Sequence, residues 1–143
     1  MKKTEKDFYQ VSLKIILNNK KGETLILKGW PSETFKGMFD LPGGRIESNE
    51  FEKPIEKIIA REVKEEIGSV KFKINLKPVG AGRCITAKSK TKIFYILFEA
   101  KYQSGKIKIS EEHMDFKWVK LNKKNVGKLF HKSLLEGVKM YLS

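Results

Sequence analysis

The chain has 143 residues, of which 40% are hydrophobic, and its 30 basic and 17 acidic side chains give a formal net charge of +13. This size predicts one folded domain over residues 1–143 with a proper core. Cys84 is the single cysteine, which excludes an intramolecular disulfide and favours a reducing compartment. Neither a signal peptide at 1–7 nor an apolar run long enough to span a bilayer is present. We therefore expect a soluble, cytoplasmic protein without a membrane partner.

The basic character of the chain does not by itself indicate a nucleic-acid-binding protein. Of the 30 basic residues, 27 are lysines spread along the chain, and only Arg45, Arg61 and Arg83 are arginines. Proteins that read bases favour the bidentate arginine side chain. A nucleic-acid partner is therefore disfavoured, and the positive charge would instead help to attract a small polyphosphate substrate.

The first half of the chain predicts two strands, a loop and a helix. A strand over 8–18 ends in a turn at 19–22, and a second strand follows over 24–28. An aromatic-rich loop over 30–39 leads to a diglycine. The main helix is expected from about Pro54 to Ile67. Its predicted core stripe consists of Ile59, Val63 and Ile67.

The second half predicts several strands and a closing helix. Strands are expected at 71–77, 80–86, 92–102, 106–109 and 115–121. Apolar residues then recur every four positions, at Val126, Phe130, Leu134 and Val138. This order of elements predicts a mixed α/β fold.

Residues 43–68 are the most informative stretch. Glu62, Glu65 and Glu66 stand at i, i+3 and i+4, so they share one face of the predicted helix. Three carboxylates this close repel one another, and a hard divalent cation, which prefers oxygen ligands, would relieve that repulsion. The alternative is an ordinary solvated acidic face. Ile55 and Ile58 fall on the same face, which predicts that this face does not point at bulk water.

The same stretch resembles the signature box of the Nudix hydrolases, G-x5-E-x7-R-E-U-x-E-E-x-G-U, where U is a bulky aliphatic residue. Gly44 and Glu50 match the first two positions, and residues 61–68 match the second half with the family's spacing. Ten residues rather than seven separate Glu50 from Arg61, which leaves the role of Glu50 open. Ser69 stands where the family has its final aliphatic residue. The resemblance implies an α/β/α sandwich with a mixed β-sheet.

The resemblance also implies a chemistry and a set of roles. Nudix enzymes use water and a divalent cation, here expected to be Mg²⁺ with Mn²⁺ as an alternative, to cleave a nucleoside diphosphate linked to another group. By position, the metal ligands would be Glu62, Glu65, Glu66 and the carbonyl of Gly43. Arg61 would hold a box glutamate in place. Glu47 would support the metal shell, or would cap the helix start together with Glu50.

A second candidate region precedes the strand that contains Trp118. Many Nudix proteins have a glutamate there that binds metal or acts as general base, and we favour Glu112 over Glu111 for this role. A plain solvated loop is the alternative. His113 is expected to be structural or exposed and His131 to lie on the surface, while Trp118 is expected in the core.

Candidate substrate contacts come from outside the box. Trp30, Phe35 and Phe39 precede it and would either stack on a nucleobase or anchor their loop in the core. Arg83 would either reach a phosphate or lie on the surface.

Three functions remain open at this point. The first is a MutT-type pyrophosphohydrolase on nucleoside triphosphates, including oxidised ones. The second is a Nudix hydrolase on ADP-ribose, a dinucleoside polyphosphate, a nucleotide sugar or a capped RNA end. The family's ADP-ribose enzymes often have a proline some fifteen residues beyond the box. That proline is absent here, because Pro78 comes too early. The third is a non-catalytic nucleotide-binding module. Nothing in the sequence decides between a monomer and a homodimer.

Overall fold

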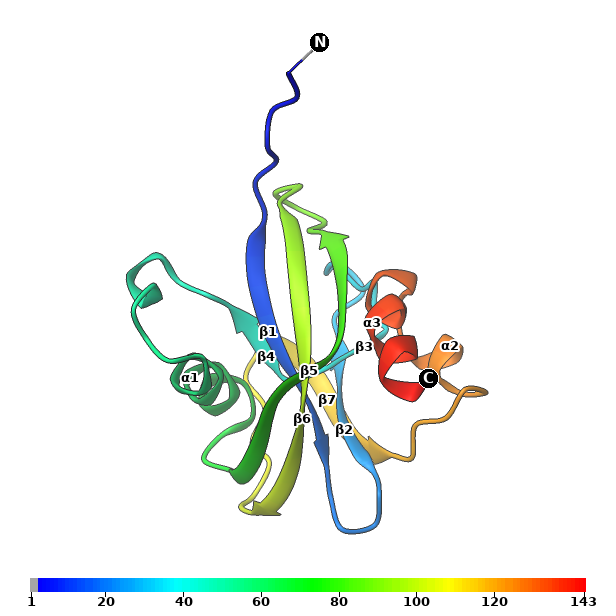
Figure 1. The fold of residues 1–143 in the computed structure, drawn as a ribbon. Coiled ribbons are helices and arrows are strands. Elements are labelled where there is room, and N and C mark those ends of the chain that lie inside the picture. The colour runs from blue at the N-terminus through cyan, green and yellow to red at the C-terminus, as the bar shows by residue number, and fades with distance from the viewer. Residues whose placement is uncertain (1–2) are drawn as a thin grey trace.

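The structure is a computed structural model that describes residues 3–143, and it confirms the α/β/α architecture (Figure 1). A mixed sheet separates α1 on one face from α2 and α3 on the other. The strands are β1 (Gln10–Asn18), β2 (Thr24–Gly29), β3 (Phe39–Asp40), β4 (Gly43–Arg45), β5 (Lys71–Ile85), β6 (Lys92–Ser104) and β7 (His113–Val119). The helices are the short 3₁₀ helix η1 (Ser48–Glu50), α1 (Ile55–Ile67), α2 (Val126–Leu129) and α3 (Lys132–Leu142).

Strand pairing places the diglycine at the centre of the sheet. β1 runs parallel to β6 along its whole length, and β5 pairs antiparallel with β6. β1 and β2 pair only at Asn18 and Thr24, at their connecting turn. Away from the turn, β4 pairs with β1, so that Gly43 and Gly44 face Lys14 and Leu13. β2 pairs instead with β3 and β7, which brings His113 opposite Gly29.

The hydrophobic core has two parts because successive residues of a strand point to opposite faces. In β1, Leu13, Ile15 and Leu17 pack towards α1, whereas Ile16 packs towards α2 and α3. The predicted stripe of α1 is confirmed: Ile59, Val63 and Ile67 are all buried. Ile58 is buried as well. Ile55, which was expected to help shield the glutamate face, is instead 48% exposed at the first position of α1.

Two predictions about the middle strands are wrong. Residues 71–77 and 80–86 are one strand, β5, with shifts of register on either side of Pro78, which has no N–H to donate to the sheet. Residues 106–109 form no strand. Their backbone groups bond to the end of α1, where Lys108 N–H donates to the Ile67 carbonyl. Ser110 N–H likewise donates to the carbonyl of Glu66.

The closing helix is two helices, not one. Phe130 has an extended backbone (φ −111°, ψ 140°), and the His131 side chain caps α3 by accepting a hydrogen bond from Ser133 N–H. The apolar spacing persists across this break because both helices face the same part of the core. Val126, Phe130, Leu134 and Val138 are all buried. No helix of the described residues combines the length and apolar character needed to cross a membrane.

Candidate active site

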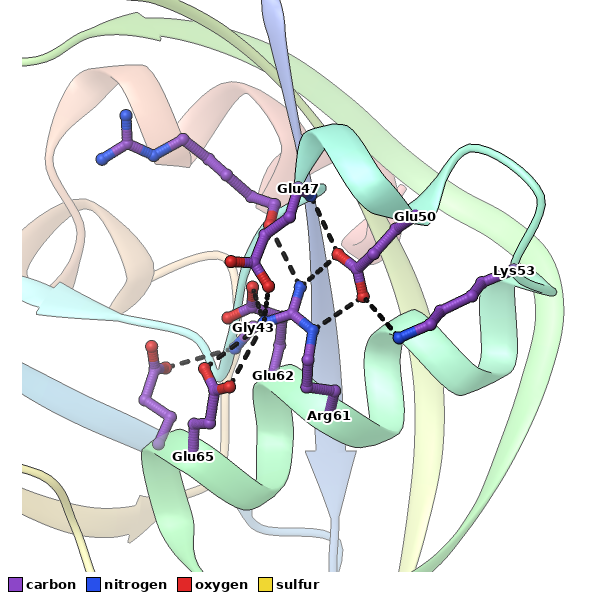
Figure 2. Close-up of polar contacts among 9 residues, drawn as sticks. Gly43, Glu47, Glu50, Lys53, Arg61, Glu62 and Glu65 are labelled. Carbon is purple, nitrogen blue, oxygen red and sulfur yellow. Dashed lines mark hydrogen bonds and ion pairs between the residues drawn. The ribbon is translucent and has the colours of Figure 1, made fainter.

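Arg61 connects the acidic side chains at the start of the site (Figure 2). Its Nε donates to Glu50 Oε2 at 2.7 Å, and its Nη1 lies 2.7 Å from Glu62 Oε1. The same Nη1 lies 3.3 Å from Glu47 Oε1 and 3.3 Å from Glu65 Oε2. One guanidinium therefore contacts four carboxylates from η1, its flank and α1. This arrangement is what the predicted positioning role of Arg61 requires.

Glu50 keeps its place in this network despite the longer spacing before the helix. Residues 51–53 form a turn between η1 and α1, which takes up the extra length. Glu47 N–H donates to Glu50 Oε1 at 2.8 Å, as in a capping box, and Glu50 is 1% exposed. Hydrogen bonds from Arg61 lower the pKa of Glu50 to about 2. Glu50 is thus a buried carboxylate that anchors Arg61.

The three helical glutamates have different surroundings. Glu65 has a side chain that is 62% exposed, whereas that of Glu62 is 13% exposed and Glu66 is 7% exposed. Burial raises the pKa of Glu62, although Arg61 opposes this. Burial also raises the pKa of Glu66 well above its usual value, against the pull of Lys14. The half-buried Glu62 and the buried Glu66 therefore lack enough positive charge to offset their loss of hydration.

The diglycine fits closely between β1 and α1. Gly43 N–H donates to Glu66 Oε1 at 3.2 Å, which ties the diglycine to the third helical glutamate. A Cβ atom on Gly44 would lie 2.0 Å from Glu62 Oε2. At Gly43, which has φ +142°, a Cβ would lie 2.1 Å from the Leu13 carbonyl oxygen. Gly43 is therefore needed for the close approach of β4 to the β1 backbone, and Gly44 leaves room for the Glu62 carboxylate in its present position.

The side chains at this site suit a hard divalent cation. Among residues 3–143 no three acidic, histidine or cysteine side chains converge on one point, because Glu62 and Glu65 turn to Arg61 while Glu66 turns to Gly43. All the donors are oxygens, and the two buried carboxylates have raised pKa values that added positive charge would lower. An oxygen-preferring cation is the group that this donor set fits.

A cavity of about 590 Å³ opens in front of these carboxylates. The helical glutamates and Arg61 form one wall, and Phe35 and Tyr95 line another part. Glu112 is exposed and also lines the cavity. Glu111 does not, and its carbonyl accepts a hydrogen bond from Trp30 Nε1 at 2.9 Å. Of these two neighbours, only Glu112 therefore has access to the cavity.

Lys14 and Asp40, which the sequence did not indicate, also line the cavity, next to His113. Lys14 Nζ lies 3.0 Å from Asp40 Oδ1, and His113 Nε2 lies 3.8 Å from Asp40 Oδ2. Burial opposes the charge on Asp40, but Lys14 and His113 outweigh it and lower the pKa of that carboxyl. His113 is buried and its Nδ1 has no hydrogen-bond partner among the described residues. In the sequence, Lys14 is one polar residue inside an apolar strand, a pattern that also fits an exposed side chain.

The candidate substrate contacts do not all reach this cavity. Phe35 is 9% exposed, lines the cavity and lies 6.0 Å from the His131 ring, centroid to centroid. Phe39 does not line it and has Lys117 Nζ 4.9 Å from its ring centroid. Arg83 is exposed, pairs with Glu136 and lines a second cavity.

The structure also shows the surroundings of His131 and Trp118, two residues outside the box. His131 is half-buried rather than on the surface, because it caps α3 and packs on Phe35. Trp118 is half-buried against the core beside α1, with its ring 5.3 Å from that of Tyr102.

Comparisons with known proteins agree with this geometry. A family model described as the NUDIX domain matches residues 8–136. The nucleoside triphosphatase NudI of Escherichia coli is 32% identical over 93 residues, which cover 60% of this chain and 64% of that protein. The chain therefore spans somewhat less than two thirds of this relative's length.

Solved structures share the fold. The MutT protein from Methanosarcina mazei Go1 has a TM-score of 0.64 and 28% identity, and the match covers 87% of this chain and 85% of that one. A NUDIX hydrolase from Nitrosomonas europaea has a TM-score of 0.66 over 93% of this chain and 86% of its own, at 17% identity. Nudix hydrolases generally use divalent cations, in agreement with the oxygen-rich site above. The signature box, its fold and the family match together establish that this chain belongs to the Nudix hydrolase family.

Proposed function

We propose that this protein is a Mg²⁺-dependent pyrophosphohydrolase that cleaves nucleoside triphosphates, including oxidised ones, by attack of water at phosphorus. The observation that carries the proposal is the wall of helical glutamates, anchored by Arg61, at the edge of the 590 Å³ cavity. The match to a nucleoside triphosphatase and to a MutT protein supports a triphosphate substrate.

The residues of the site divide into those that would bind the cation and one, Arg61, that orients two of them. Glu62, Glu65 and Glu66 would hold the cation, with the Gly43 carbonyl as a further ligand. When bound, a divalent cation neutralises phosphate oxygens and makes water more acidic. Arg61 keeps Glu62 and Glu65 oriented, which limits the reorganisation needed during the reaction.

Glu112 is the group that would accept a proton from the attacking water. It lines the cavity with the helical glutamates and is exposed, so a bound substrate and water can reach its carboxylate. A carboxylate in that position can take a proton without ligating the cation.

A second candidate is a Nudix hydrolase that acts on a nucleoside diphosphate bearing another group. The observation that favours it is the second, basic cavity next to the acidic one, which offers room beyond a simple triphosphate.

A release assay with Mg²⁺ tests both candidates. The substrates are nucleoside triphosphates, 8-oxo-dGTP, ADP-ribose, diadenosine polyphosphates and nucleotide sugars. Pyrophosphate from a triphosphate supports the first candidate, and preference for another diphosphate supports the second. Nucleotide binding without any hydrolysis would overturn both in favour of a binding module.

The metal assignment is tested with Glu65→Gln, which removes one charge from an exposed side chain. We expect kcat to fall about 100-fold or more, in the range typical for loss of a group that stabilises transition-state charge. Glu52→Gln is the matched control, because Glu52 is also an exposed glutamate but does not line the cavity. Unchanged activity of Glu65→Gln with Mg²⁺ would contradict the assignment.

A further inference from the structure

A second cavity, of about 710 Å³, adjoins the acidic one. Thr34, Cys84 and Thr86 line both cavities, so the two are neighbours that share part of their walls. The walls come from segments that are distant in the sequence: the end of β5 with its turn into β6, the loop before β3, Tyr9 and the start of α3. A ligand seated at the helical glutamates could therefore extend into this second space.

All the charged residues that line the second cavity are basic, and we call it the basic cavity. Its charged lining residues are Lys36, Arg83, Lys90, Lys92 and Lys132, and no acidic side chain of the described residues lines it. Glu136 pairs with Arg83 at 3.5 Å and Asp7 pairs with Lys92 at 2.6 Å, both on exposed side chains. The other three lysines form no ion pair within residues 3–143. This local excess of positive charge in a concave space favours a bound anion.

The backbone of the cavity supports the same conclusion. Lys36 (φ 51°) and Lys90 (φ 55°) have left-handed backbones, and they are the two non-glycine residues of the described chain that do. Glycine would adopt this conformation without steric cost, whereas lysine adopts it at a cost. Both residues line the basic cavity. Unfavourable backbone conformations of this kind concentrate at functional sites.

The positive charges also act on one another. Burial lowers the pKa of His131, and the nearby charges of Lys36 and Lys132 lower it further. These side chains come from the loop before β3 and from the start of α3, so the fold has brought like charges together. An anionic ligand would relieve this repulsion.

We propose that this basic cavity binds a phosphate group of the substrate that is separate from the diphosphate held at the helical glutamates. This inference rests on the proposed function, which places the diphosphate at the acidic cavity. The substrate class is then a nucleotide with an additional phosphate, carried either by a longer polyphosphate chain or by a phosphorylated ribose. Both sources present the same chemistry to the lysines, namely a dianionic group within reach of several ammonium donors.

Binding of inorganic tripolyphosphate, measured by calorimetry in EDTA, tests the cavity without catalysis or metal. The acidic cavity repels this probe when no cation is present. The double variant Lys90→Gln/Lys132→Gln should weaken binding at least tenfold, because both side chains are exposed lysines of the cavity without acidic partners. The matched control is Lys106→Gln/Lys120→Gln, which removes the same charge from exposed lysines outside both cavities. It should change the affinity less than twofold.

Two results would overturn the basic cavity as a phosphate site. One is the absence of tripolyphosphate binding to the unaltered protein. The other is equal weakening in both double variants, which would show a non-specific effect of net charge. Thermal unfolding of each variant confirms that the fold is retained, so that a loss of binding is assigned to the cavity.

Kinetics then identifies the source of the extra phosphate. One pair of substrates is diadenosine triphosphate and pentaphosphate, and the other is ADP-ribose and its 2′-phosphate. We expect a preference in one of the two pairs: the member with more phosphate should have a kcat/KM at least tenfold higher. The pair that shows it identifies the source, a longer polyphosphate chain or a phosphorylated ribose. Lys90→Gln/Lys132→Gln should abolish that preference. Hydrolysis without a preference in either pair overturns this inference but not the proposed hydrolase. Tripolyphosphate binding without hydrolysis of any substrate would overturn the proposed hydrolase but would leave the basic cavity as a phosphate site.

Discussion

At the scale of single residues, the site depends on one ion pair, between the buried Glu50 and the half-buried Arg61. Glu50 sits in η1 and Arg61 in α1, and their contact joins the loop after the diglycine to the helix that carries the glutamates. A buried carboxylate of this kind is stable only with its partner, since an unpaired charge loses its hydration without compensation. Arg61 in turn holds Glu62 at 2.7 Å. Loss of Glu50 should therefore disturb the fold and the site together.

Glu50→Gln should make the protein less stable at neutral pH and flatten its stability profile in acid. The pKa of Glu50 is lowered from 4.5 to about 2 in the fold. A lowered pKa means that the charged pair stabilises the fold above pH 4.5 and that this contribution is lost as the pH falls towards 2. Thermal unfolding between pH 2 and 7 should show the unaltered protein losing more stability over that window than the variant.

The control is Glu52→Gln, because Glu52 is an exposed glutamate two residues away. It should keep the acid profile of the unaltered protein. Parallel profiles for Glu50→Gln and the unaltered protein would show that the Arg61 pair does not contribute through ionisation.

The sequence identified Glu62, Glu65 and Glu66 as neighbours because helical spacing alone places them on one face. It did not identify Lys14 and Asp40, because their contact joins β1 to the end of β3 and is set by strand pairing. The role of Glu50 was left open for a related reason. Glu50 and Arg61 are separated by more residues than in the family pattern. Only the structure shows that the turn at 51–53 takes up the extra length, so that Glu50 still contacts Arg61.

At the scale of elements, α1 serves both the core and the site. Its apolar stripe packs against the sheet, while its glutamates face the diglycine of β4. The stripe was predictable from helical periodicity. The exposure of Ile55 was not, because periodicity gives the direction of a side chain but not whether another element covers it.

Ile59→Ala should lower the free energy of unfolding by about 2–5 kcal/mol, as is usual when a large buried aliphatic side chain is removed. Ile59 is 0% exposed between α1 and the sheet. Ile55→Ala makes the same chemical change in the same helix at a position that is 48% exposed, and should cost less than about 1 kcal/mol. Urea unfolding of both variants measures the difference. Equal losses would mean that α1 is anchored along its whole length rather than by its stripe.

The elements that the sequence mispredicted share a physical cause. Residues 106–109 have strand-like composition, but the amides of Lys108 and Ser110 donate to carbonyls at the end of α1 instead of to a neighbouring strand. The closing helix breaks after Phe130 although its apolar period continues, because two helices at an angle can cover one core face with the same spacing. In both places tertiary contacts override a local pattern.

At the scale of the whole molecule, an acidic stretch lies within a basic chain. Residues 43–68 hold seven acidic and five basic side chains, so this stretch has a net charge of −2 while the chain as a whole has +13. The acidic cluster therefore sits within a protein that attracts anions at a distance. A nucleotide would be drawn towards the molecule by its overall field and received by the basic cavity that adjoins the glutamates.

The kcat/KM for a nucleotide substrate should therefore fall as salt rises, by about tenfold between low salt and 0.5 M KCl. Salt shortens the reach of surface charges from about 10 Å at 0.1 M to about 3 Å at 1 M, so the loss should appear in KM while kcat changes little. Free Mg²⁺ is held constant, and sucrose of equal osmolality is the control for solvent effects. A fall in kcat at constant KM would contradict this expectation, because it would place the effect of salt at the glutamates and not in the attraction of the substrate.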